Sequence, residues 1–412
     1  MSMSRPPFPA GWASVRMDPR NLSLANTLPV GQAFLWHRLP LPATDPPFEE
    51  YSRAVHSPPR VVCLRQSPTH IYYTAVYPPG SAPEPDRSNH FTRQWLEDYF
   101  QLVRYPDLET LYLDWRRRDP QLFGKVHVSD RATGVRVLRQ DPWECLLAFI
   151  TSTNNHIPRI TSLLHKFSQS FTEPVLTLKH PSNGISIPYH LFPAPHQIPT
   201  TLEKPLRDMG FGYRAPFIEA SLQMLRNKFG DKEGDIEAGL VGWRNQDVDI
   251  VRENLIALKG VGRKVADCVM LMCLDKPSLI PIDTHVAHIA ARHPAFPSRL
   301  KNKAMSKQVY EETQEFLLDR WGPMGGWCQA VLFAADLPQS QGKIKVKTKV
   351  ESVVKTAVKT ETSLDSVDHV RRKRKESEEE KPPALKRTRS ATMQAKQVIV
   401  GVDIKYDENT DR

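Results

Sequence analysis

Two short segments near the amino end are runs of the β-branched and aromatic residues that are typical of strands. They are RVVCLRQ (60–66) and HIYYTAVY (70–77), and the turn-forming sequence Ser67-Pro68-Thr69 separates them. This arrangement predicts a β-hairpin. The segment LPVGQAFLWHRL (28–39) predicts a further strand, in which Gly31 indicates either a bulge or a place where another group approaches the backbone closely.

Apolar residues recur with helical spacing in two segments before residue 138 and through most of residues 140–338. Asp141-Pro142 is a favourable helix start, because Asp caps a helix and Pro suits its first turn. The Pro-rich stretch 180–199 is predicted to be an irregular surface loop. The predicted helical segments are TRQWLEDYFQLV, DLETLYLDWRRR, WECLLAFITSTNN, RITSLLHKFSQSF, LEKPLRDMG, PFIEASLQMLRNKF, VDIVRENLIAL, RKVADCVMLMCL, DTHVAHIAAR, KQVYEETQEFLLDRW and GWCQAVLFAADL.

These patterns divide the chain into a β-rich domain at 1–138, a helical domain at 139–339 and a tail at 340–412. The tail contains one aromatic residue, Tyr406, among dense charges, so we expect it to be disordered. It holds 18 of the 56 Lys and Arg residues and 12 of the 46 Asp and Glu residues, which places +6 of the net +10 there. Its basic clusters, Arg371–Lys375 and Lys386–Arg389, favour recognition by the nuclear import machinery over a merely solvated charged tail.

Composition excludes several classes of protein. The 412 residues contain no uncharged apolar run long enough to span a membrane, and the amino end has no continuous apolar segment of a secretion signal. Mitochondrial targeting stays open, since the first twenty residues hold three arginines but also helix-disrupting prolines. Five scattered cysteines without a C-x-x-C pair suit reduced thiols in the cytosol or nucleus and argue against zinc ribbons and four-cysteine iron–sulfur clusters.

The segment 255–292 (LIALKGVGRKVADCVMLMCLDKPSLIPIDTHVAHIAAR) carries the most informative pattern. A helix ends near Leu258, and Gly260 and Gly262 form a tight hairpin before the next helix. These glycines permit positive φ and leave backbone N–H groups free to bind a phosphate without reading sequence. Taken alone, the pattern fits a plain turn between two helices equally well.

Lys264 and Asp283 favour the interpretation that the hairpin binds phosphate beside a catalytic site. Lys264 lies in the first turn of a helix, where the dipole disfavours positive charge and so favours the neutral amine that a nucleophile requires. Asp283 precedes the helix that starts at Thr284 and would be unremarkable as a cap alone. A helix-start lysine and a helix-start carboxylate beside such a hairpin fit attack on a sugar carbon that bears positive charge.

The segment 255–292 resembles that of the helix–hairpin–helix DNA glycosylases, most closely the eukaryotic 8-oxoguanine DNA glycosylase/lyases. The resemblance extends over roughly 28–337 and leaves out the stretch 180–199 and the tail. It implies an α+β fold, with an N-terminal antiparallel β-domain packed on two mostly helical subdomains. Its matching segments are LPVGQAFLW (28–36), RQDPWECLLAFITSTNNHIPRI (139–160), MGFGYRAPFI (209–218), VADCVMLMCLDKP (265–277) and WGPMGGWCQAVLFAADL (321–337).

The resemblance also implies roles for individual residues. Lys264 matches the nucleophile that forms a Schiff base and supports β-elimination, and Asp283 matches the acid that stabilises an oxocarbenium-like sugar. Gly31, Cys268, Pro281, Asp283, Gln329 and Phe333 match the residues that bind the flipped base. Asn154, Arg159 and Arg214 match contacts to the opposite cytosine, Tyr213 matches the wedge in the duplex, and Gly260, Gly262 and His285 match contacts to phosphate.

The expected partner is double-stranded DNA that contains oxidised guanine, bound by a monomer in the nucleus. No cofactor or catalytic metal is expected; His285-x-x-His288 lacks a further ligand. The carbonyls of Ile256, Leu258 and Val261 are a candidate site for a structural cation. The sequence departs from the family pattern at His156 and Pro158, and at Arg263, whose positive charge we expect beside Lys264 and against a phosphate.

Two other functions fit parts of the sequence. An alkylpurine or mismatched-adenine glycosylase of the same superfamily would lack the lysine, and the adenine type usually carries a four-cysteine cluster. A non-catalytic helix–hairpin–helix module of a scaffold protein would need the hairpin alone. The Lys264–Asp283 pair counts against both, so the sequence predicts a bifunctional glycosylase and lyase for oxidised purines.

Overall fold

The computed structural model describes residues 4–42, 46–83, 86, 89–126 and 130–337. The predicted tail, with its basic clusters, lies outside these residues. Among the described residues, no helix is both long and apolar enough to cross a membrane. The helices are α1 (Leu24–Thr27), α2 (His90–Tyr99), α3 (Leu108–Arg118), α4 (Phe123–Val126), α5 (Pro142–Ser152), α6 (Ile157–Phe171), α7 (Glu203–Met209), α8 (Ala215–Phe229), α9 (Asp235–Gly242), α10 (Val248–Ala257), α11 (Arg263–Cys273), α12 (Thr284–Ala291), α13 (Lys307–Trp321) and α14 (Gly325–Asp336).

A five-stranded antiparallel sheet forms the amino-terminal part, in the order β1-β5-β4-β3-β2. The predicted hairpin is confirmed as β4 and β5, which pair from Val61 opposite Val76 to Gln66 opposite Ile71. Alternate residues of β4 face opposite sides: Val62 packs towards α2, and Cys63 packs towards a second hairpin. The strands are β1 (Ala13–Arg16), β2 (His37–Pro40), β3 (Glu49–Val55), β4 (Arg60–Gln66) and β5 (His70–Val76).

The strand predicted for 28–39 is wrong over most of its length. Regular strand structure starts only at His37, and residues 28–36 run as an irregular segment. Gly31 has φ of +82°, which lies outside the range of a strand. At Gln32, side-chain hydrogen bonds take the place of the backbone pairing that a strand would have. The Gln32 amide donates to Thr27 O at 3.0 Å and Arg136 O at 2.8 Å, and accepts from Leu138 N at 3.0 Å. Tertiary hydrogen bonds therefore override the local strand pattern.

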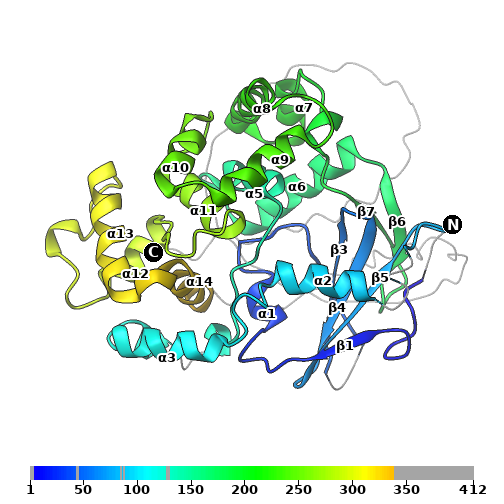
Figure 1. Ribbon diagram of the computed structural model, residues 1–412, viewed down its shortest axis with the longest axis horizontal. Helices are drawn as coiled ribbons and strands as arrows, with labels where there is room; N and C mark the ends of the chain where they lie inside the picture. Colours follow the sequence, from blue (N-terminus) through cyan, green and yellow to red (C-terminus); the bar gives the residue numbers. More distant parts are fainter. Residues whose placement is uncertain (1–3, 43–45, 84–85, 87–88, 127–129, 338–412) are drawn as a thin grey trace, which may run out of the picture. The chain divides into compact units, whose positions relative to one another are not determined.

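The loop predicted for 180–199 is also wrong in part. It contains β7 (Ser186–His190), which pairs antiparallel with β6 (Pro174–Lys179). Pro188 is tolerated because the sheet has only two strands and leaves each with an unpaired edge. Leu178 and Tyr189 of this hairpin pack against the five-stranded sheet, and Figure 1 shows β6 and β7 beside it.

The predicted helices are confirmed, and the structure adds α9 and the short helices α1 and α4, which were not predicted. Asp141 caps α5 as expected, accepting a hydrogen bond from Glu144 N at 2.9 Å. Nearly every residue of α5 is buried, and α5 packs along α11 in the centre of the helical core. The antiparallel sheet and the many helices confirm the α+β fold class; that 1–138 and 139–339 are separate domains stays a prediction.

Candidate active site

The hairpin between α10 and α11 exposes the start of the lysine helix. Gly260 has φ of +78°, and a Cβ there would lie 2.8 Å from Cβ of Phe217, so both its conformation and its surroundings require glycine. Gly262 is different: its φ of −93° is open to any residue, so the positive φ that glycine permits is not used at this position. A Cβ on Gly262 would meet open space, and no side chain caps α11. The first N–H groups of α11 therefore form an uncapped helix N-terminus.

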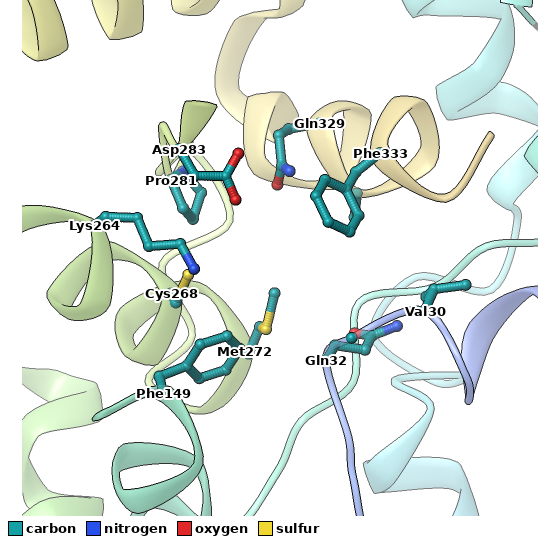
Figure 2. A pocket seen from close by; sticks show the side chains of 12 residues that line it. Val30, Gln32, Phe149, Lys264, Cys268, Met272, Pro281, Asp283, Gln329 and Phe333 are labelled. Atoms are coloured by element: carbon teal, nitrogen blue, oxygen red, sulfur yellow. The ribbon is translucent and has the colours of Figure 1, made fainter. Parts of the chain in front are cut away.

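A pocket of about 460 Å³, partly open to solvent, lies at this helix. Lys264, Cys268 and Met272 face it at intervals of four residues, as one face of α11 must. Figure 2 shows Phe149 of α5 beside them and the residues of α14 opposite. The lining residues are Val30, Gly31, Gln32, Phe149, Lys264, Cys268, Met272, Pro281, Asp283, Gln329, Ala330 and Phe333. Every residue predicted for catalysis or base binding is among them.

Lys264 and Asp283 both present their charged ends to this pocket (Figure 2). The Lys264 amine lies 5.5 Å from the ring centroid of Phe149. Asp283 caps α12 as predicted, with Oδ1 accepting from Val286 N at 2.9 Å. Within the described ranges no ion pair joins the two side chains, so amine and carboxylate stand apart with space between them.

Cys268 and Phe333 face each other across the pocket (Figure 2). Burial raises the pKa of the Cys268 thiol to about 12, which keeps it neutral at physiological pH. The thiol therefore serves as a compact, polarisable wall and not as a second nucleophile. A sulfur and an aromatic ring are both groups that pack favourably against flat aromatic rings.

Gln329 carries the clearest unmet hydrogen-bonding demand in the pocket. Its side chain is only 7% exposed, and its buried Oε1 has no hydrogen-bond partner among the described residues. Leaving such a group unsatisfied costs about 1–3 kcal/mol. A ligand with an N–H group at this edge of the pocket would recover that energy.

Five lining residues were missed by the sequence analysis. They are Val30, Gln32, Phe149, Met272 and Ala330. Four of them were detectable, because they neighbour Gly31 or Gln329 or lie four residues after Cys268. Phe149 could not be detected, since α5 is apolar on all sides and its sequence does not distinguish a pocket residue from a core residue.

The residues predicted to read the opposite base gather at a different place. Asn154, with φ of +48°, is exposed, and Arg159 is exposed and donates to Gly210 O at 3.2 Å. Tyr213 is 48% exposed and donates to Thr153 O at 3.0 Å. None of Asn154, Arg159, Tyr213 and Arg214 lines the pocket. They surround the turn at 153–154 instead.

Arg214 is the buried member of this group, with 3% exposure. Its guanidinium donates to Thr153 O at 3.1 Å and to Asn154 O at 2.9 Å, and it lies 4.5 Å from the centroid of the Tyr213 ring. Burial lowers the pKa of Arg214 from its usual value. The Arg214 side chain thus fixes the exposed turn, whereas Arg159, in the first turn of α6, bonds to Gly210 instead.

His285 and Arg263 each contact a carboxylate. His285 Nε2 lies 3.0 Å from Asp336 Oδ2, and its ring packs edge-on against Phe333 at 5.0 Å. The position expected for Arg263 is wrong. Its guanidinium turns to α13, where it donates to Glu311 at 2.9 Å, so it is engaged away from the pocket.

Comparison with known proteins agrees with this fold and site. Residues 14–146 match the family described as 8-oxoguanine DNA glycosylase, N-terminal domain. The N-glycosylase/DNA lyase of Saccharomyces cerevisiae is 30% identical over 363 residues, covering 82% of this chain and 89% of the yeast protein. The N-glycosylase/DNA lyase OGG1 of Arabidopsis thaliana is 29% identical over 357 residues, covering 86% and 89%.

Two solved structures show the same architecture. The apo form of Clostridium acetobutylicum 8-oxoguanine glycosylase/lyase is 26% identical, with a TM-score of 0.58 and coverage of 78% of this chain and 96% of that one. MBOgg1 in complex with a low affinity DNA ligand is 25% identical, with a TM-score of 0.60 and coverage of 79% and 95%.

The fold and the lysine–aspartate pocket thus define a DNA glycosylase of the helix–hairpin–helix class. Within that class, the chain belongs to the 8-oxoguanine N-glycosylase/DNA lyase family.

Proposed function

We propose that this protein excises 8-oxoguanine, and also formamidopyrimidine purines, opposite cytosine in double-stranded DNA, and then cleaves the strand as a lyase. The observation that carries the proposal is a pocket that combines Lys264, Asp283 and the Gln329 amide oxygen, which has no hydrogen-bond partner among the described residues. A glycosidic bond inside the base stack is out of reach, so the target nucleotide must be flipped into this pocket.

Catalysis is assigned to two side chains. The Lys264 amine attacks C1′ of the sugar and gives up a proton, the bond from C1′ to the base breaks, and the base leaves with the bonding electrons and takes up a proton. The Asp283 carboxylate stabilises the positive charge that develops on the sugar. The sugar ring opens to a Schiff base on Lys264; loss of a C2′ proton then expels the 3′ phosphate, and water releases the lysine.

Recognition of the base is assigned to the remaining polar and flat groups of the pocket. The Gly31 carbonyl is assigned to accept the ring N–H that 8-oxoguanine has and guanine lacks. Cys268 and Phe333 sandwich the ring, Pro281 packs against it, and Gln329 reads its Watson–Crick edge. An acceptor inside the pocket favours 8-oxoguanine, because the wrong base would leave that acceptor unpaired.

The helix–hairpin–helix is assigned to binding of the DNA backbone. The uncapped start of α11, together with Gly260, Gly262 and His285, is assigned to phosphate contacts. We also assign a structural cation to the hairpin, where the carbonyls of Ile256, Leu258 and Val261 offer the oxygen ligands that hard cations prefer. This cation would offset the negative charge of the phosphate and take no part in the chemistry.

The base opposite the lesion is expected to be read by Asn154, Arg159 and Arg214. Replacing Arg159 with alanine should lower the preference for lesion:cytosine over lesion:adenine by roughly tenfold to a hundredfold, because a good base contact discriminates by about 1–3 kcal/mol. Cleavage opposite cytosine should persist, since Arg214 still holds the turn at 153–154. Single-turnover rates on duplexes with C, A, G or T opposite the lesion measure this.

The matched control is Arg207→Ala, which removes an exposed arginine that pairs only with Glu203 in the described residues. It should leave the preference unchanged. An Arg159 variant that slows all four duplexes alike, with a weaker salt dependence, would show that Arg159 anchors phosphate and does not read the base.

The protein is proposed to act as a monomer in the nucleus, reached through import receptors that bind the tail; a mitochondrial fraction is left open. Deleting residues 340–412 should leave activity on short duplexes nearly unchanged, because the described fold ends with α14 before the deleted segment. The same deletion should redistribute a fluorescent fusion out of the nucleus. A misfolded or wholly nuclear truncated protein would contradict this assignment.

The proposed activity is tested by incubating the protein with a duplex that carries one 8-oxoguanine opposite cytosine. Chromatography of the released base and electrophoresis of the strand should show both base release and a nick 3′ to the lesion. Base release without nicking would identify a monofunctional glycosylase. Binding without either product would identify a non-catalytic DNA-binding module.

A further inference from the structure

A buried carboxylate lies behind the catalytic face of α11. Asp267, one turn after Lys264, has 0% exposure and lies outside the pocket. Its Oδ2 accepts hydrogen bonds from the Tyr310 hydroxyl and the Gln314 amide of α13, each at 2.8 Å. Its Oδ1 lies 3.3 Å from Nε of Arg252 on α10. Charge-assisted bonds from two other helices therefore fix this point of α11.

The same two residues of α13 also hold the segment that leads to Asp283. The Tyr310 hydroxyl accepts from Ile282 N at 3.1 Å, and the Gln314 amide donates to Ile280 O at 2.9 Å. Burial and the adjacent Asp267 raise the pKa of Tyr310 well above its usual value, so the hydroxyl keeps the proton that it donates. A continuous set of hydrogen bonds thus joins the lysine helix to the backbone just before the catalytic aspartate.

We propose that Asp267 is a positioning residue that, through Tyr310 and Gln314, sets the separation of Lys264 and Asp283. The proposal rests on the assignment of Lys264 and Asp283 as the catalytic pair. Because no ion pair joins those two side chains among the described residues, their separation must be fixed by what holds each backbone. The separation must be held closely, since a shift of about 1 Å in a reacting group can cost about 10²-fold in rate.

The alternative is that Asp267 serves stability alone, as many buried ion pairs do. That role predicts fewer folded molecules but a normal rate for each folded one. A positioning role predicts a slower chemical step in protein that is folded and binds DNA normally. The two roles are therefore separated by measuring rate and affinity on the same folded protein.

The test uses Asp267→Asn and Tyr310→Phe in the full chain. Single-turnover base release from an 8-oxoguanine:cytosine duplex, with enzyme in excess, should fall by about 10- to 100-fold in Asp267→Asn. Borohydride trapping on a duplex with a natural abasic site should slow similarly. Affinity for a duplex with a tetrahydrofuran abasic analogue should not change. Tyr310→Phe should slow both steps, and the double variant should be no slower than the slower single variant.

The matched control is Glu144→Gln, a buried carboxylate that pairs with Arg53 at 2.6 Å and has no bond to α11 or α13 in the described part of the chain. It should lower the melting temperature and leave the rate of folded enzyme unchanged. Normal rates in both Asp267→Asn and Tyr310→Phe, or additive losses in the double variant, would overturn the proposal. Tyr310→Phe keeps the test decisive if Asp267→Asn does not fold. A wild-type protein that is not trapped would instead refute the proposed function.

Discussion

Replacement of Lys264 with glutamine is expected to abolish both base release and strand nicking while lesion binding persists. The amine lies in the first turn of α11 and faces the pocket, next to Phe149 and away from any carboxylate partner in the described residues. Glutamine keeps most of the volume of lysine but cannot attack C1′. Activated nucleophiles contribute several kcal/mol, so we expect a loss of about 10³-fold or more.

Single-turnover kinetics on an 8-oxoguanine:cytosine duplex, with an electrophoretic binding assay on the same DNA, measure this result. Lys228→Gln is a suitable control, because that lysine is exposed on α8 and bonds to Asn254. Near-normal nicking by the purified Lys264 variant would show that another group is the nucleophile.

Replacement of Asp283 with asparagine is expected to cost about 10²- to 10³-fold in base release, the usual effect of removing one electrostatic contact to the transition state. Asparagine caps helices about as well as aspartate, so α12 should keep its start and the protein its stability. The loss then reports on the charge alone. Asp283→Ala should show the same kinetic loss together with about 1 kcal/mol of lost stability.

Thermal unfolding and single-turnover rates of both variants separate these effects. If Asp283→Asn excised the base at the wild-type rate, the carboxylate would be a helix cap and nothing more. If Asp283→Ala were as stable as the wild type, the hydrogen bond to Val286 would contribute little to α12.

Local signals in the sequence were sufficient where one element decides the structure. The turn at 67–69 predicted the hairpin of β4 and β5, and the Asp141 and Asp283 caps predicted two helix starts. Local signals failed where distant residues decide. Residues 28–36 lose their strand pattern to the bonds of Gln32, and β7 forms because Tyr189 packs on a sheet more than a hundred residues earlier.

The pocket residues also divide into those that the sequence indicated and those that only the structure showed. Lys264 and Asp283 were found through the pattern at 255–292, whereas the base-binding residues were implied by the resemblance to the glycosylase family; the fold brings them together around one cavity. Phe149 and Asp267 were not found, because their contacts come from other helices and leave no local pattern. Sequence therefore indicated the groups that do chemistry, whereas the groups that place them required the structure.

The covalent intermediate is the central claim, and borohydride reduction during turnover tests it most directly. The full chain is incubated with an 8-oxoguanine:cytosine duplex and sodium borohydride, and the adduct is digested and located by mass spectrometry. We predict a reduced sugar–DNA remnant on Lys264, present in the wild type and absent in Lys264→Gln. An adduct on a different residue, or strand cleavage that proceeds without any trapped adduct, would contradict the account.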